Sequence, residues 1–445
     1  MNKSTLALAM AAGVLAQQAS AAGFVEDSKA TLGLRNFYIN TDYRDGTGPN
    51  KNEEWGQGFD LRFISGYTQG TVGFGIDAIG LLGVKLDSGG GTNGAANSAA
   101  YGGTVFPSKS NGEAVDDFSS LGLTAKAKIS QTELKLGTLQ PKLPVIVTND
   151  GRLLPQTWEG GQLTSGDIKD LTLVGGQIEH VKGRNSSNNE QLAINGASPR
   201  TINSNKFIYA GGDYKITKDL TAQYYYGNLE DFYKQHFLGL VHNWAIGPGV
   251  LKSDFRYFNS TDDGANGSNP LYYSTGNYSG VANGKGKVDN NLYSGLFLYS
   301  VAGHTFGGGY QVSNGSSDFP WLNQGDGSSN YTITDSQIQK FARAGERTWQ
   351  ARYSFDFAKV GVPGLTAGVV YLHGDNIDTV NARGAEAANG ASEWERDLSV
   401  GYVVQSGALK NLGVAWKNAS WRTDLPNTRS QDENRLIVSY SIPLL

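Results

Sequence analysis

Positively charged side chains recur inside segments that otherwise alternate between polar and apolar residues. These residues, the ones best suited to act on a solute, are Arg35, Arg62, Lys126, Lys128, Arg256, Arg352, Lys417 and Arg435. Guanidinium and ammonium groups along a low-dielectric wall attract anions, and several in series let an anion pass from site to site. The pattern therefore predicts a basic path for negatively charged solutes.

A second interpretation of these charges is purely structural. Acidic residues lie nearby in the same segments, among them Asp60, Asp254 and Glu133. A charge that faces the interior of a protein is stabilised by an opposite charge beside it. Both the pairing role and the solute-binding role stay open for each basic residue.

Catalytic and metal-binding patterns are absent from the sequence. The five histidines, at positions 180, 236, 242, 304 and 373, have no metal-ligand spacing, and no nucleophile-elbow motif accompanies the many serines. Hydrogen bonding at a rim or in a lumen is the role expected for each histidine. An outer-membrane serine hydrolase or peptidase is the alternative function, and a histidine within hydrogen-bond reach of a serine, with an acid behind it, would support it.

Strands of period two are the elements that must position the charges. Apolar residues alternate with polar or charged ones in segments 59–64, 121–136 and 435–442, and basic residues fall on the polar face of each. An Arg or Lys facing lipid costs roughly 2–4 kcal/mol at the bilayer midplane. We therefore expect one face of each strand to meet lipid and the other a wet lumen.

The connections between these strands fall into two length classes. Short turns such as 216–219 alternate with long irregular stretches, which are expected at 87–117, 141–169, 259–288, 313–345 and 374–394. Short periplasmic turns and long extracellular loops are typical of outer-membrane barrels, and some loops can fold into the bore. No linker divides the chain, so residues 22–445 are predicted to form one barrel domain.

The N-terminus has the pattern of a secretory signal. Lys3 precedes an apolar run over residues 6–16, and the small residues 19–21 form a cleavage site. We expect residues 1–21 to be a signal peptide, with cleavage after Ala21 or Ala22. The apolar run is too short for a transmembrane helix, and no later stretch is long enough.

Composition supports a barrel with a polar interior. The chain combines 60 Gly, 22 Tyr, 18 Phe and 8 Trp with a mean hydropathy of −0.36, so it is rich in aromatic residues yet polar on average. With no cysteine, its stability must come from the hydrogen bonds of a closed sheet. A net charge of −4 gives no support to nucleic-acid binding, which calls for a basic domain or patch.

Several stretches resemble one family across the whole mature chain and in the family's order. They are GYTQGTVGFGIDAIGLLGVKLDSG (66–89), VTNDGRLLPQT (147–157), ARAGERTWQARYSFDF (342–357), YVVQSGALKNL (402–412) and ENRLIVSYSIP (433–443). They are similar to the porin D (OprD) family of substrate-specific outer-membrane channels. The resemblance implies an 18-stranded antiparallel barrel, one pore per chain, and a third extracellular loop that folds inward as a constriction.

The resemblance also implies roles for particular residues. Arg152 would be the constriction arginine and Asp150 an acid opposing it, while a ladder of basic residues guides carboxylates. Lys417 occupies a ladder position, whereas Ala415 and Gly401 stand where some members carry basic residues. With fewer basic residues in the ladder and with the motif TNDGRLLPQT, the chain resembles more closely the branch that takes up aromatic and other monocarboxylates, including vanillate. Some members have also been catalogued as serine peptidases.

Together these features predict a passive porin of the cell outer membrane, with no catalytic residues. A small carboxylate would meet Arg152 and then Arg62, Arg352, Lys417 and Arg435, with Arg35 and Arg256 on the same path. No ATP motif and no plug domain is found, so transport should run down a gradient. No cofactor and no metal are expected. The partners expected are carboxylate solutes, outer-membrane lipid and lipopolysaccharide, with a monomeric pore or a weak homotrimer. A structural or adhesive barrel with a filled interior is a further alternative.

Overall fold

The computed structural model describes residues 23–44, 46, 50–88, 104–194, 203–264, 287–323, 329–380, 386–426 and 428–445. The expected signal peptide at 1–21 lies outside these residues and stays a prediction. Most of the described chain is β-strand, and one short 3-10 helix, η2 (Phe357–Val360), is present among the described residues. No helix in this part of the chain is long and apolar enough to cross a membrane.

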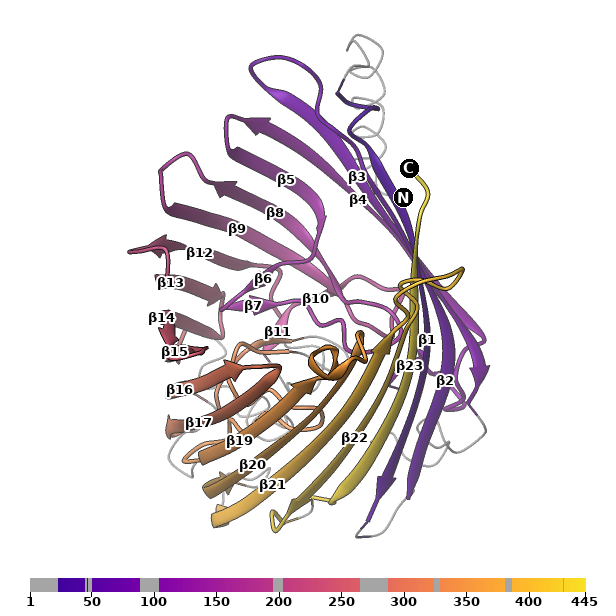
Figure 1. Cartoon of the computed structure of the whole chain (residues 1–445). Coiled ribbons are helices and arrows are strands. Elements are labelled where there is room, and N and C mark those ends of the chain that lie inside the picture. The colour runs from indigo at the N-terminus through magenta and orange to yellow at the C-terminus, as the bar shows by residue number, and fades with distance from the viewer. Residues whose placement is uncertain are drawn as a thin grey trace.

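Eighteen long strands form the wall of the molecule (Figure 1). They are β1 (Lys29–Tyr43), β2 (Lys51–Ile64), β3 (Gly73–Asp87), β4 (Asp117–Ile129), β5 (Thr132–Leu139), β8 (Thr157–Ser165), β9 (Leu171–Lys182), β12 (Phe207–Lys215), β13 (Leu220–Leu229), β14 (Tyr233–Ile246), β15 (Gly249–Asp262), β16 (Asp289–Val301), β17 (His304–Gly315), β19 (Arg347–Asp356), β20 (Leu365–Val380), β21 (Glu386–Val403), β22 (Gly413–Thr423) and β23 (Gln431–Pro443). The remaining described strands have two residues each: β6 (Lys142–Leu143), β7 (Ile146–Val147), β10 (Glu190–Gln191), β11 (Ala193–Ile194) and β18 (Leu322–Asn323).

The wall is a closed antiparallel barrel. Each long strand pairs with its neighbours along the chain, and β1 pairs with both β2 and β23. Thr31 lies opposite Pro443, so the two ends of the barrel sequence meet at one rim. Closure leaves no unpaired sheet edge, as a membrane-spanning sheet requires. The predicted all-β, 18-stranded transmembrane fold is confirmed.

Side chains alternate between the two faces of this wall, as the period-two pattern predicted. Leu61, Leu123 and Leu436 are 47%, 41% and 44% exposed on the outer face. Their neighbours in sequence face inward, where Arg62 pairs with Asp60 and Lys126 with Asp77. The apolar residues thus form an outer surface of the kind that suits lipid, and the charged residues face the interior of the barrel.

Connections at the rim that carries the chain ends are short, and several at the other rim are long. The turn 216–219 joins β12 to β13 as predicted. Two expected irregular stretches were partly wrong, because 141–169 contains β8 and most of 374–394 belongs to β20 and β21. Glycines 160 and 161 weaken the alternation in β8, and register shifts after Gly374 interrupt it in β20. Residues 89–103, 265–286, 324–328 and 381–385 of the expected irregular stretches lie outside the described chain.

The buried core lies inside the barrel, between the wall and the inward loops. One cluster joins Trp158, Phe207, Phe237 and Phe258 to loop residue Phe319, and a second joins Phe37 and Leu81 to loop residues such as Phe106 and Leu153. Figure 1 shows β6, β7, β10 and β11 within the ring of wall strands. The loops therefore fill part of the bore and leave a narrower passage than the wall itself encloses.

Candidate functional site

The loop 140–156, between β5 and β8, folds into the barrel and packs against β2. Its Leu153 is 2% exposed and lies against Gly56 and Gly58, where an added Cβ would come within 2.8 Å and 2.9 Å of Leu153 atoms. The small strands β6 and β7 pair with each other and stiffen the start of the loop. This is the third connection at the rim opposite the chain ends, which is the loop the family resemblance expected to fold inward.

Arg35 and Asp150 join the tip of this loop to the wall. Arg35 Nη1 donates to Asp150 Oδ1 at 2.7 Å and to the carbonyl oxygen of Arg152 at 2.7 Å. The Asp150 carboxylate is therefore already engaged by a wall cation. Both side chains are partly exposed, so the ion pair itself contributes little free energy, about 0–1 kcal/mol.

Arg152 points away from Arg35 and toward β23. Its Nη2 lies 3.9 Å from Glu433 Oε2, and its side chain is only 13% exposed. Its buried Nε has no hydrogen-bond partner among the described residues. The nearer cation to Glu433 is Arg435, whose Nη2 lies 2.6 Å from Glu433 Oε1. Arg152 Nη1 donates to the carbonyl oxygen of Gly151 at 3.2 Å, and the described residues leave part of its remaining donor capacity unused.

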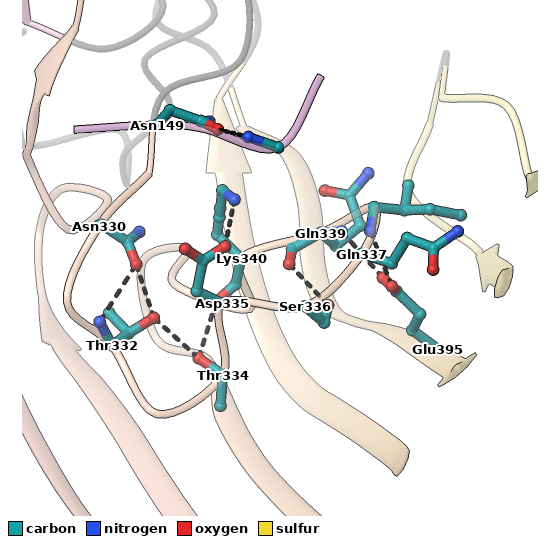
Figure 2. A network of polar contacts seen from close by, with 12 residues as sticks. Asn149, Asn330, Thr332, Thr334, Asp335, Ser336, Gln337, Gln339, Lys340 and Glu395 are labelled. Atoms are coloured by element: carbon teal, nitrogen blue, oxygen red, sulfur yellow. Dashed lines mark hydrogen bonds and ion pairs between the residues drawn. The ribbon is translucent and has the colours of Figure 1, made fainter. Parts of the chain in front are cut away.

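A second inward loop, 329–346, faces Arg152 across the bore. Figure 2 shows how its polar side chains hold the loop in shape. Asn330 Oδ1 accepts from Thr332, Thr334 Oγ1 donates to the carbonyl oxygen of Lys340 at 2.7 Å, and Ser336 Oγ donates to that of Gln339 at 2.7 Å. Lys340 also pairs with Asp335.

The base of this second loop is anchored by buried carboxyl groups. Glu346 and Glu393 are each 1% exposed. Burial raises the pKa of the Glu346 carboxyl well above its ordinary value, and the neighbouring Glu393 raises it further. Trp421 Nε1 donates to Glu393 Oε2 at 2.9 Å, and Asp318 Oδ1 accepts from the Ala344 amide at 2.8 Å.

Between the two loops lies a cavity of about 320 Å³. Four basic side chains and one acidic side chain line it: Arg152, Arg184, Lys340, Arg435 and Asp335. Asp335 is engaged by Lys340, so positive charge is in excess. A cavity of this kind can hold an anion through charge-assisted hydrogen bonds, in a water-poor setting where those bonds are strong.

The other predicted basic residues are spread along the wall and are not gathered in this cavity. Arg62 is held by both oxygens of Asp60, at 2.8–3.0 Å. Arg256 is similarly bound by Asp254, at 2.7 Å and 2.9 Å, and lies over the Tyr331 ring. Arg352 donates to Gln350 and to the carbonyl oxygen of Ile333. The structural interpretation of these charges thus accounts for much of their contact geometry.

Lys417 differs from these residues. It is exposed, lies opposite Arg435 and Ser399 in the sheet register, and makes no hydrogen bond or ion pair with any described residue. Lys126 and Lys128 lie beside Tyr67, near the rim of the chain ends, and Lys126 is bound by Asp77 at 2.6 Å. Lys417 is thus a lumen cation without a hydrogen-bond or ion-pair partner among the described residues.

Sequence reasoning missed Arg184, Lys340 and Asp335. Arg184 is the second residue after β9, is 3% exposed, and donates to Asn149 Oδ1 at 3.0 Å. Lys340 and Asp335 lie in a loop of irregular sequence, where no alternation marks which side chains face the pore. Only the meeting of these residues with the loop 140–156 inside the bore reveals them as lining one cavity.

The histidines give no support to a catalytic triad. His236 and His304 hydrogen-bond to Tyr224 and Tyr353, and His180 lies 3.8 Å from Glu159. Across the described ranges, no histidine is hydrogen-bonded to a serine. The described residues also contain no group of three or more His, Cys, Asp or Glu that could hold a metal ion.

The basic cavity between the two inward loops, called the eyelet below, lies inside a closed barrel. This arrangement is that of a channel with a constriction, and comparisons with known proteins place the chain in a family of channels. The family model described as outer membrane porin, OprD family, matches residues 22–444. The chain belongs to the OprD family of outer-membrane porins. It is 38% identical to the porin-like protein GalP of Pseudomonas putida over 98% of this chain and 96% of that one. Porin D of Pseudomonas aeruginosa is 34% identical, over 100% and 99%.

Solved structures of this porin family share its architecture. The crystal structure of Pseudomonas aeruginosa OccK8 (OprE) has 61% sequence identity and a TM-score of 0.85, covering 95% of this chain and all of that one. That of Pseudomonas aeruginosa OpdK with vanillate has 37% identity and a TM-score of 0.82, with the same coverage. The fold and the family place this porin in the outer membrane. Its relatives are named as channels, not as enzymes.

Proposed function

We propose that this porin takes up small carboxylate-bearing solutes passively, and that the cavity between the two inward loops is their binding site. The excess of positive charge around that cavity carries the proposal. Arg152 would meet the carboxylate. The acid near its guanidinium, Glu433 at 3.9 Å, is already paired to Arg435 and so compensates little of the Arg152 charge. Arg184 and Lys340 would add positive charge around the bound anion.

The path beyond the eyelet would run along the wall toward the rim of the chain ends. Lys417 is its free cation. Arg352 adds a positive charge that is hydrogen-bonded to neutral oxygens, and Arg62 adds one that Asp60 compensates. Arg35, Asp150 and Arg256 would contribute chiefly by holding the loops. Weak binding at several sites permits both entry and release.

Aromatic and other monocarboxylates are the proposed substrates, in preference to basic amino acids. A relative at 37% identity has a crystal structure with vanillate, which is an aromatic carboxylate. The apolar side chain of Ile338 lies beside the basic groups of the cavity, which suits a solute with one charged end and one apolar end. We further propose one pore per chain, with lipid and lipopolysaccharide against its apolar outer face and a homotrimer as the alternative assembly.

The test is block of single-channel current by benzoate in a planar bilayer. Replacing Arg152 with Gln removes one charge-assisted contact, so the benzoate concentration for half-block should rise roughly tenfold. Lys218→Gln, the same change on a side chain 89% exposed in a turn, is the matched control. Equal block of wild type and Arg152→Gln would refute the proposed binding site, and stronger block by arginine than by benzoate would refute the proposed substrate class.

A further inference from the structure

Wall cations bind the backbone of the loop 329–346 at three successive points. Arg256 Nη1 donates to the carbonyl oxygen of Tyr331, Arg352 Nη2 to that of Ile333, and Arg435 Nη2 to that of Gln337, each at 2.7 Å. The three arginines come from β15, β19 and β23, on separate parts of the wall. Part of the hydrogen-bonding capacity of each arginine is therefore used by the loop and is not available to a solute.

Wall carboxylates bind the amide groups of the same loop at its tip. The amides of Ile338 and Gln339 donate to the two oxygens of Glu395, each at 2.8 Å. The Gln337 amide donates to Asp397 Oδ2 at 3.2 Å. Glu395 is fully buried, at 0% exposure, and Figure 2 shows its carboxylate directed at this tip.

Apolar packing does not hold the tip in place. Residues 335–340 are all only half-buried, and none belongs to the buried hydrophobic clusters of the described chain. The apolar anchors Ile333 and Phe341, at 4% and 1% exposure, flank the tip on either side. Between these anchors, hydrogen bonds to charged wall groups are the contacts available to fix the backbone.

We infer that Glu395 is a positioning residue that clasps the loop tip 335–340 against β21 and so sets the width of the eyelet. Its carboxylate accepts from two consecutive backbone amides. Asp397 and Arg435 bind the amide and the carbonyl oxygen of the preceding residue, Gln337. Because Ser336, Gln337, Ile338 and Lys340 all line the cavity, a displaced tip would open the constriction. Several charges that the sequence suggested for solute binding thus serve to hold this loop.

Glu395→Gln tests the clasp at the wall. The glutamine side chain has one acceptor oxygen and one NH2 donor, whereas both oxygens of Glu395 accept from backbone amides. In the variant, one backbone N–H would therefore face an NH2 group and lose its hydrogen bond. We expect a roughly tenfold higher population of a displaced, higher-conductance state, seen as larger and noisier single-channel currents in KCl alone. The matched control is Glu133→Gln, which alters a lumen carboxylate bound to Tyr67 and Lys135 near the other rim.

Gln339→Pro tests the same contact from the loop, because proline has no N–H to donate to Glu395 while the wall stays intact. A single Ser336→Cys in this cysteine-free chain reports access to the eyelet through its rate of thiol labelling. Faster labelling and larger currents in Glu395→Gln or Gln339→Pro would support the clasp. The proposal would be overturned by folded variants of both kinds that keep the wild-type current and that, combined with Ser336→Cys, are labelled at the rate of Ser336→Cys alone. KCl current does not depend on carboxylate binding, so this result is independent of the benzoate test.

Discussion

At the scale of single residues, the lumen charges divide into those the protein engages and those it leaves free. Arg35 and Arg62 are bound by Asp150 and Asp60, whereas Lys417 makes no hydrogen bond or ion pair with any described residue. A bound charge is largely compensated before a solute arrives. The free charges should therefore dominate the selectivity of the pore.

Lys417→Gln is expected to lower anion selectivity without affecting stability. A unit charge in a water-filled lumen contributes about 1 kcal/mol at 4 Å, which corresponds to a roughly fivefold change in anion occupancy. The reversal potential across a KCl gradient measures this. Lys410→Gln, the same change on an exposed side chain in the turn 404–412, should leave the potential unchanged. An identical shift in both variants would mean that Lys417 does not act in the pore.

At the scale of elements, the two inward loops are seated on the wall by different means. The loop 140–156 inserts Leu153 against glycines of β2, so shape and apolar burial hold it. The tip of the loop 329–346 depends on charged hydrogen bonds. We therefore expect the first loop to be a rigid side of the eyelet and the second to be the adjustable side.

Gly58→Val should push the rigid loop toward the pore axis. A Cβ at position 58 would approach the carbonyl oxygen of Leu153 to 2.9 Å, and crowding of this kind costs about 1–3 kcal/mol if the loop does not move. Single-channel conductance should fall. Gly80→Ala on the outer face of β3 is the control, since its added Cβ would lie 3.8 Å from the nearest atom. Unchanged conductance in a folded Gly58→Val protein would contradict this account of the loop seat.

At the scale of the whole molecule, one closed sheet has an apolar outer face suited to lipid and a polar inner face suited to water. Its outer face carries exposed residues such as Leu61, Tyr402 and Leu436, and its inner face carries the ion pairs and the loops. Because β1 and β23 pair along nearly their full length, no sheet edge between them is left unpaired. The barrel is therefore closed by the strands of a single chain.

A charge should be tolerated on one face of this wall and not on the other. Leu436→Arg, near the middle of β23, places a cation in lipid and should cost about 2–4 kcal/mol of unfolding free energy. Ser441→Arg, on the lumen face of the same strand, should cost far less, because the guanidinium meets water. Urea unfolding in lipid vesicles compares the two. Equal losses would mean that the two faces of β23 do not differ in environment as we describe.

The sequence alone determined the barrel and the inward face of its strands. Period-two alternation depends only on neighbours along one strand. A charged side chain between leucines must face the lumen, because the lipid face would cost free energy. The motif RLLPQT, through its family resemblance, also singled out Arg152. Where alternation is weak, as at the glycines of β8, the sequence did not reveal the strand.

Only the tertiary structure decided which charges are free and where the eyelet lies. Arg35 meets Asp150 across 115 residues of chain, and Glu395 meets Ile338 across 57, so no local pattern could reveal either contact. The cavity with Arg152, Arg184 and Lys340 exists because two irregular loops fold into the same bore. Whether a charge binds a solute or holds a loop depends on contacts in space, which the linear order of residues does not specify.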